Sequence, residues 1–258
     1  MSSLLNVSIE GHIAQVTINN PPANTWTLDS LKELKNIITE LNSNKAVYAL
    51  VLTGQGEKFF SAGADLNVFA SGDKGVAFDM ASVFGEAFET LRDFNGVTIA
   101  AINGYAMGGG LEVALACDIR ICEDQAQMAL PEAKVGLLPC AGGTQNLSWL
   151  VGEGWAKRMI LCGERVDSKT ALKIGLVEEV VAKGGSLEAA MKLAQQTSQQ
   201  SPTSITACKQ LIQAGRAASI NSALPLEREL FVSLFNSKDQ KEGVNAFLEK
   251  RAPVWLNE

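Results

Sequence analysis

Apolar and polar residues alternate at the start of the chain on either side of Glu10-Gly11. The apolar positions are Val7, Ile9, Ala14, Val16 and Ile18. A period of two predicts two half-buried strands joined by a tight hairpin. Beyond Asn19-Asn20-Pro21-Pro22 the spacing becomes helical, from Leu28 to Leu41, with Thr27 placed to accept a hydrogen bond from the first free amides. An amphipathic helix is expected there.

Two short apolar runs in the middle of the chain, at 49–52 and 98–102, are each followed by a glycine turn. Runs of this length predict buried strands. Phe84, Phe88 and Leu91 indicate a helix between them, so the order strand, helix, strand predicts parallel pairing through a helical crossover. A further strand is expected at 118–122, after a helical stretch.

Helical patterns dominate after Leu138. They cover 142–150, 153–161, 168–174, 187–198, 205–217, 223–235 and 239–250. Only 176–181 interrupts them as a candidate strand. With the strands of the first half, this order predicts an α/β fold with one large core and a smaller C-terminal region.

Composition narrows the class of protein. The 258 residues are 47% hydrophobic and 19% charged, which is typical of a globular protein able to bury a sizeable core. A net charge of -6 disfavours nucleic acid and anionic membrane surfaces as partners. The chain contains no apolar run of the length that a membrane span requires, and its first residues do not resemble a targeting signal, so we expect a cytoplasmic protein.

The cysteine and histidine content disfavours disulfides and metals. The five cysteines are odd in number, scattered and mostly set among apolar neighbours, so we expect reduced core residues. They are Cys117, Cys122, Cys140, Cys162 and Cys208. With His12 as the only histidine, no metal site is expected.

Three glycines, 108–110, stand between a predicted strand and a predicted helix that contains Glu112. Glycines allow the backbone to approach a ligand, and free amides at a helix start can hold an oxygen that becomes negative. On the glycines alone, a tight packing turn is the more common explanation. Glu112 has almost only apolar neighbours, and burying an unpaired carboxylate is costly and raises its pKa. Either Glu112 is functional or its helix face reaches solvent.

Glu132 follows Pro131 and is, by itself, most simply a solvated loop or helix-start residue. If it converged with Glu112 on one cleft, the two carboxylates could hold a water molecule between them. The sequence does not show whether they converge. The small residues of the loop at 56–66 would allow a second amide to point at a bound oxygen, although a turn capped by Asp65 is the alternative.

Three segments, Phe60 to Leu66, Asn103 to Glu112 and Pro131 to Gln145, together resemble the enoyl-CoA hydratase (crotonase) family. The resemblance covers essentially the whole chain. It implies a spiral of ββα units in residues 1–200 and a helical trimerisation region in residues 201–258. It also implies homotrimers, or hexamers built as dimers of trimers. The substrate would be an acyl-CoA thioester, with no separate cofactor.

The resemblance also assigns residue roles. Glu112 and Glu132 match the two catalytic glutamates, the first activating water for attack at C3 and the second handling the C2 proton. The amides of Ala64 and Gly109 match the oxyanion hole. The substrate-binding positions are Ala62, Asp65, Leu66, Gly108 and Pro131. Because both glutamates are present, hydration of a 2-enoyl-CoA is the leading prediction, and a double-bond isomerase or a non-catalytic binding subunit are the alternatives.

The chain departs from the common family pattern at a few positions. Cys140 replaces a usual glycine, and Asn146 and Ser148 stand where basic and proline residues are frequent. Trp26 and the stretch 68–83 could reshape the acyl pocket. The alternative for Trp26 is a plain core tryptophan.

Overall fold

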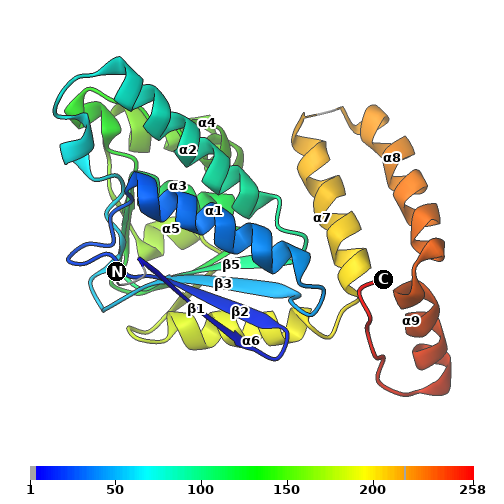
Figure 1. Ribbon diagram of the computed structural model, residues 1–258. Coiled ribbons are helices and arrows are strands. Elements are labelled where there is room, and N and C mark those ends of the chain that lie inside the picture. Colours follow the sequence, from blue (N-terminus) through cyan, green and yellow to red (C-terminus); the bar gives the residue numbers. More distant parts are fainter. Residues whose placement is uncertain (1–3, 218) are drawn as a thin grey trace.

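The computed structural model describes residues 4–217 and 219–258, and its core is a six-stranded sheet (Figure 1). The strand order is β1-β2-β3-β5-β7-β10. Their bounds are β1 Leu5–Glu10, β2 Ile13–Ile18, β3 Ala49–Gly54, β5 Val97–Ile102, β7 Ile119–Glu123 and β10 Glu179–Val181. Strand β1 pairs antiparallel with β2, whereas all the other neighbours are parallel. The predicted hairpin and parallel crossovers are confirmed, and β10 is shorter than the candidate strand at 176–181.

The two faces of this sheet are covered by different helices. Successive side chains point to opposite faces, so Val51 and Ile99 pack with Ala190 of α6 (Ser186–Thr197), while Leu50 and Leu52 belong to the larger cluster on the other face. That cluster includes residues of α1 (Leu28–Ser43), α2 (Lys74–Arg92) and α3 (Gly109–Ala116). Figure 1 shows α6 below the sheet and the other three helices above it.

Several helix boundaries follow directly from the sequence. The hydroxyl of Thr27 accepts the amide hydrogen of Ser30 at 3.2 Å and so caps α1 as predicted. The expected helices at 142–150 and 153–161 form one element, α4 (Gly143–Leu161), which is kinked because Gly152 has a φ of 75°. Helix α5 spans Ser168–Ile174, and the short 3-10 turns are η1 Leu66–Phe69, η2 Glu132–Val135 and η3 Leu234–Asn236.

A second, smaller sheet lies beside the first. Its order is β4-β6-β8-β9, with bounds Phe59–Ser61, Tyr105–Met107, Gln127–Ala129 and Val166–Asp167. The hydrophobic pattern does not reveal these strands, because two or three residues are too few to display a period. The chain passes three times from a long strand to a short strand and then to a helix, through β3-β4-α2, β5-β6-α3 and β7-β8-α4. This is the expected spiral of ββα units.

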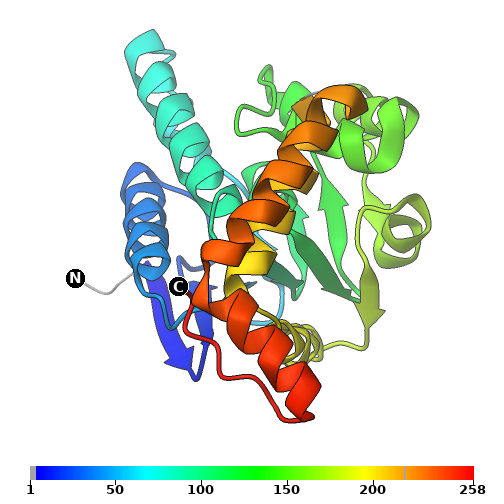
Figure 2. The same ribbon diagram turned by 90° about the vertical axis from the view of Figure 1, so that its right-hand side faces the viewer.

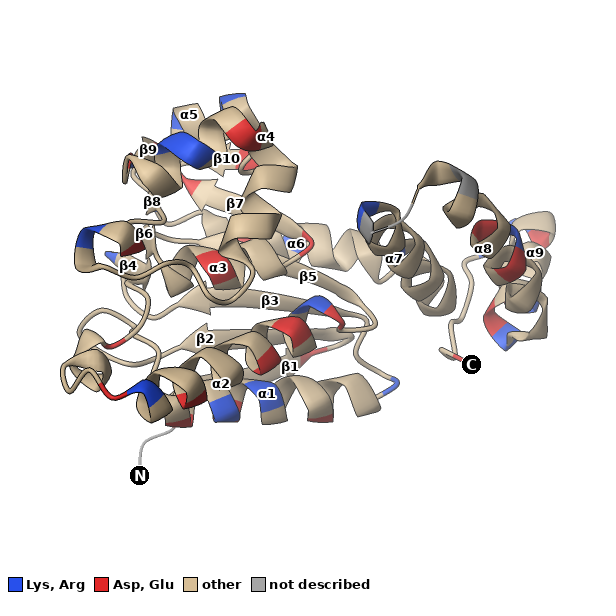
Figure 3. Cartoon of the chain, turned by 90° about the horizontal axis from the view of Figure 1, so that it is seen from above, with Lys and Arg blue, Asp and Glu red and all other residues tan. Residues whose placement is uncertain are grey.

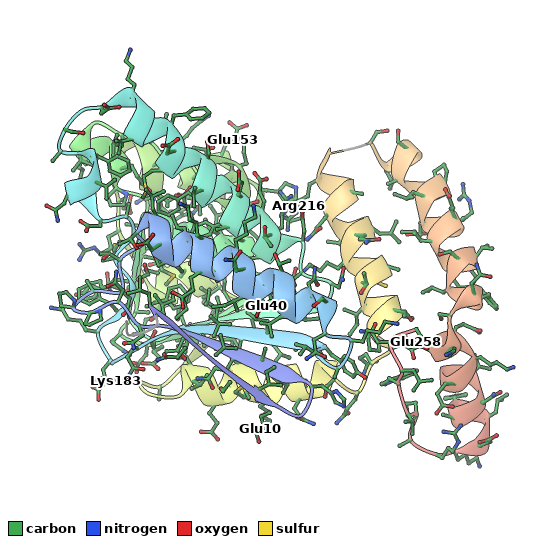
Figure 4. The ribbon with its side chains drawn as sticks, in the orientation of Figure 1. Glu10, Glu40, Glu153, Lys183, Arg216 and Glu258 are labelled. Atoms are coloured by element: carbon green, nitrogen blue, oxygen red, sulfur yellow. The ribbon has the colours of Figure 1, made fainter. Side chains whose placement is uncertain are left out.

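Three C-terminal helices stand to one side of the core (Figures 1 and 3). They are α7 Pro202–Ala217, α8 Ile220–Ser233 and α9 Lys238–Glu249. Figure 2 shows α8 and α9 in front of the core. Helix α7 is attached to the core by an ion pair of 2.7 Å between Lys209 and Asp118. The guanidinium of Arg216, which is labelled in Figure 4, lies 4.1 Å from the ring centroid of Trp149. The predicted division at residue 200 falls between α6 and α7, and it stays a prediction.

The prediction that the cysteines are core residues is only partly right. Cys117 and Cys122 are buried free thiols, but Cys140, Cys162 and Cys208 are exposed. Apolar sequence neighbours are a poor guide at these three positions, because Cys162 caps the end of α4 and Cys208 lies on the outlying α7. Within residues 4–217 and 219–258, no helix has both the length and the apolar character needed to cross a bilayer.

Candidate active site

The loops that follow β4, β6 and β8 come together at one edge of the small sheet. These strands are neighbours and run parallel, so their carboxyl ends lie at the same edge. Ligands of parallel α/β sheets commonly bind at that edge. Ala64 follows β4, Gly109 follows β6, and Glu132 follows β8. The topology therefore assembles the three motifs, which are separated in sequence, into one place.

Glycines allow the three loops to touch. Gly63 has a φ of 91°, and a Cβ atom there would lie 2.7 Å from the carbonyl oxygen of Met107 and 3.2 Å from the amide nitrogen of Gly109. Gly108 has a φ of 55°, and its Cβ would lie 3.2 Å from Oε1 of Glu132. Both backbone conformations disfavour larger residues. The glycines thus bring the backbone close to the carboxylate and also form the expected packing turn.

Two backbone amides remain available at this junction. Trp26 pairs with the loop after β4, since its amide donates to the carbonyl of Gly63 at 2.8 Å and its carbonyl accepts from the amide of Asp65 at 3.0 Å. This bridge anchors Ala64 without using its N–H. In the part of the chain that the structure describes, no acceptor is bonded to the amide of Ala64 or Gly109. Both N–H groups can therefore bind an oxygen of a ligand.

Glu112 is buried but has hydrogen-bond partners. It lies in the first turn of α3 with an exposed fraction of 3%, so the alternative of a solvent-facing helix face is wrong. Its Oε1 accepts from the amide of Ala141 at 2.8 Å and of Gly143 at 2.9 Å. Burial raises the pKa of Glu112, and these amides oppose that rise because they stabilise the carboxylate.

Glu132 lies in a different environment. Both of its carboxylate oxygens are shielded from solvent, and neither has a hydrogen-bond partner among the described residues. Burial, followed by the negative charge of Glu112, raises the pKa of Glu132 to about 7. Glu132 is the first residue of η2, so the interpretation as a helix-start residue is confirmed, but its carboxylate is not solvated. At neutral pH this carboxyl group is protonated in a large fraction of the molecules.

The two carboxyl groups converge on one mainly apolar pocket of about 330 Å³. Every residue that the sequence assigned to the site lines this pocket except Asp65. The shared lining comprises Ala62, Ala64, Leu66, Gly108, Gly109, Glu112, Pro131 and Glu132. The Asp65 carboxylate instead accepts the amide hydrogen of Asn67 at 3.0 Å and caps η1. The loop after β4 is thus both a capped turn and part of the pocket, and a contact of Asp65 with substrate stays a prediction.

Comparison with known proteins identifies the family. The sequence model of the enoyl-CoA hydratase/isomerase family matches residues 8–258. The chain belongs to this family. A short-chain-enoyl-CoA hydratase of Clostridium acetobutylicum is 39% identical over 243 residues, covering 94% of this chain and 93% of the relative.

Solved structures show the same fold. The Pseudomonas aeruginosa protein DspI is 66% identical with a TM-score of 0.96, and the match covers 99% of this chain and 97% of DspI. An enoyl-CoA hydratase of Bacillus anthracis is 35% identical with a TM-score of 0.95, and the match covers 99% of this chain and 100% of the Bacillus anthracis chain. The crotonase-like α/β fold is thus confirmed.

Several further residues line the pocket, and one of them, Phe69, lies in the stretch 68–83 that the sequence suggested could reshape it. Most are apolar: Phe69, Phe84, Met107, Val135, Leu137 and Leu138. A single sequence does not distinguish an apolar residue that faces a pocket from one that faces the core. Cys140, noted only as an unusual residue, also lines the pocket. Although the residue as a whole is exposed, desolvation of its thiol and the charges of the two glutamates raise the pKa of this thiol to about 11, so the thiol is neutral at physiological pH.

Among the residues that the structure describes, no group of three or more His, Cys, Asp or Glu side chains is placed to hold a metal ion. The expectation that the reaction uses no separate cofactor stays a prediction.

Proposed function

We propose that this chain is an enoyl-CoA hydratase, which adds water across the 2,3 double bond of a 2-enoyl-CoA to give a 3-hydroxyacyl-CoA. The observation that carries the proposal is the unequal environment of two carboxyl groups in one pocket. Glu112 accepts two amide hydrogen bonds, which favour its ionised form, whereas Glu132 has no partner and a raised pKa. Such pairs divide naturally into a base and an acid.

In the proposed reaction, a water molecule held between the two carboxyl groups attacks C3. The carboxylate of Glu112 takes a proton from this water as the new C3–O bond forms. The electrons of the double bond move toward the thioester, and the carboxyl group of Glu132 delivers its proton to C2. Proton exchange with solvent then restores the starting ionisation states, so the net change is the addition of one water molecule.

The free amides of Ala64 and Gly109 complete this scheme as a proposed oxyanion hole. When C3 is attacked, negative charge develops on the thioester oxygen as an enolate. Two N–H donors aimed at that oxygen stabilise it, and removing one such donor costs roughly 3 to 4 kcal/mol of barrier in other enzymes. Both amides lie at the edge of the pocket that holds Glu112 and Glu132.

We assign the remaining predicted positions to the CoA part of the substrate. Ala62, Leu66, Gly108 and Pro131 line the pocket, and Asp65 shapes the loop between Ala62 and Leu66. We place the protein in the cytoplasm, where acyl-CoA thioesters are available.

For the assembly we propose a homotrimer, or a hexamer of two trimers. The C-terminal helices expose large apolar side chains that a second copy would cover, among them Phe231, Phe235, Phe247 and Leu248. Sedimentation of the purified chain gives its oligomeric mass, and a monomer at micromolar concentration would contradict this assembly.

A spectroscopic assay tests the activity. The purified chain should decrease the ultraviolet absorbance of crotonyl-CoA or of a longer 2-enoyl-CoA, since hydration removes the conjugated double bond. Glu132→Gln should abolish most of that decrease. Glu40→Gln, an equal charge change on the exposed surface of α1 (Figure 4), should leave it intact.

The competing activities give different results in the same assay. If the wild-type chain leaves every 2-enoyl-CoA untouched but converts 3-enoyl-CoA to 2-enoyl-CoA, the isomerase alternative replaces our proposal. If it binds acyl-CoA and catalyses neither reaction, the chain is a non-catalytic binding subunit.

A further inference from the structure

Trp26 is completely buried beside the candidate active site. Its exposed fraction is 0%, and it is among the largest fully buried side chains. Its ring packs edge-to-face against Phe88, with 5.7 Å between centroids, and Phe88 packs in the same way against Phe84 at 5.5 Å. Phe84 lines the pocket. Trp26 thus belongs to a row of three aromatic rings, which we call the aromatic wall, that ends at the pocket surface.

The aromatic wall lies directly behind the amide proposed for the oxyanion hole. A Cβ atom on Gly109 would lie 2.9 Å from Cε1 of Phe84 and 3.6 Å from Cδ1 of Trp26. The wall therefore bounds the pocket next to the thioester carbonyl and the first carbons of the acyl chain. Closely packed interiors do not yield easily, so a bulky group at these carbons would have to displace aromatic rings.

We propose that Trp26 is a specificity-determining residue that restricts the substrate to unbranched 2-enoyl chains and excludes those with a bulky substituent at C3. The inference rests on the proposed hydratase function. Trp26 acts through its volume. It packs against Phe88 on the side away from the pocket, so neither Phe88 nor Phe84 has room to move away from a bulky substrate. This explains why a tryptophan, rather than a smaller apolar residue, occupies the position.

The indole N–H provides an independent observation. Nε1 of Trp26 is buried and has no hydrogen-bond partner among the described residues. An unpaired buried donor costs stability. The presence of the indole N–H at this position in spite of that cost indicates that the size and shape of the indole ring are what the position requires. Replacement by phenylalanine removes this unpaired donor. The backbone bonds of Trp26 to Gly63 and Asp65 do not depend on the side chain, so the loop of Ala64 keeps its anchor.

The test compares two substrates in a series of variants. Crotonyl-CoA carries a methyl group at C3, and cinnamoyl-CoA carries a phenyl ring. In Trp26→Leu, the ratio of kcat/KM for cinnamoyl-CoA to that for crotonyl-CoA should rise about tenfold or more, since even one methylene in an apolar pocket changes discrimination by about this factor. Trp26→Phe should raise the ratio less, in proportion to the smaller loss of volume. An unchanged ratio in both variants would overturn the proposal.

A binding measurement separates this inference from the hydratase proposal. The Kd values of the saturated analogues 3-phenylpropanoyl-CoA and butyryl-CoA, measured by calorimetry, report the pocket shape without catalysis. Their ratio should shift in favour of the phenyl analogue in both Trp26 variants. If the wild type hydrates no enoyl-CoA but this shift occurs, the hydratase proposal fails and the specificity role stands. If hydration occurs without any shift, the specificity role fails.

Phe94→Leu is the matched control. Phe94 is a fully buried aromatic residue of the same core cluster, but it lies beyond the opposite end of α2 from the pocket. This substitution should lower the melting temperature and leave both ratios unchanged. If Trp26→Leu does not fold, Trp26→Phe decides the question alone. In that case, a ratio of kcat/KM for cinnamoyl-CoA to crotonyl-CoA that does not rise in folded Trp26→Phe contradicts the proposal that the volume of Trp26 sets the specificity.

Discussion

Replacing Glu132 with glutamine should stabilise the protein at alkaline pH while it abolishes activity. The pocket raises the pKa of this carboxyl from 4.5 to about 7, because burial and the charge of Glu112 disfavour ionisation. The native state therefore holds the proton more tightly than the unfolded chain. This contribution to stability is fully present below pH 4.5 and is lost as the pH rises through 7. Glutamine does not ionise, so the variant does not undergo this loss.

The magnitude follows from the shift in pKa. A rise from 4.5 to about 7 corresponds to about 3.4 kcal/mol at 1.36 kcal/mol per pH unit. The carboxylate oxygens are shielded, but the Glu132 residue as a whole is only half-buried, so nearby solvent screens the interaction and we expect about 2 kcal/mol. The unfolding free energy of Glu132→Gln should exceed that of the wild type by roughly half a kcal/mol at pH 5 and by about 2 kcal/mol at pH 9.

Urea denaturation at pH 5, 7 and 9, at one protein concentration, measures this difference. Glu40→Gln removes the same charge from the exposed surface of α1 and serves as the control. The reasoning is refuted if the difference between Glu132→Gln and wild type is equal at pH 5 and pH 9, or if Glu40→Gln shows the same growth with pH.

Three further predictions follow from the site and its supports. The kcat/KM for hydration of crotonyl-CoA should fall about tenfold per pH unit above pH 7, because Glu132 loses its proton. A kcat/KM that stays the same from pH 6 to pH 9 would contradict its role as the acid. Gly143→Ala places a Cβ 2.8 Å from Oε1 of Glu112, so kcat should drop by at least about tenfold with little change in KM, measured at steady state. Asn24→Ala removes the hydrogen bonds that the Asn24 side-chain amide donates to the carbonyls of Gln55 and Phe59, at 3.0 and 2.9 Å. The unfolding free energy, measured in urea, should fall by about 2 kcal/mol. An unchanged unfolding free energy would show that the segment 55–59 is held in place without these bonds.

Local patterns in the sequence determined the large sheet and most of the helices. The period of two predicts the hairpin of β1 and β2, helical spacing predicts α1, and the order of strands and helices predicts parallel pairing. These features depend on residues that are near one another in the chain, and they are therefore readable in one sequence. The motifs around Ala64, Gly109 and Glu112 were also recognisable, and the resemblance to the enoyl-CoA hydratase family linked them.

Only the tertiary structure brought those motifs together in one pocket. Strands β4, β6 and β8 are too short for a readable pattern, yet their order in the small sheet brings Glu132 to Glu112 across twenty positions of sequence. The pKa of Glu132 depends on burial and on that neighbouring charge, and the aromatic wall depends on how α2 packs against Trp26. Such properties arise between segments that are distant in the chain. They exist only once the fold has placed those segments together.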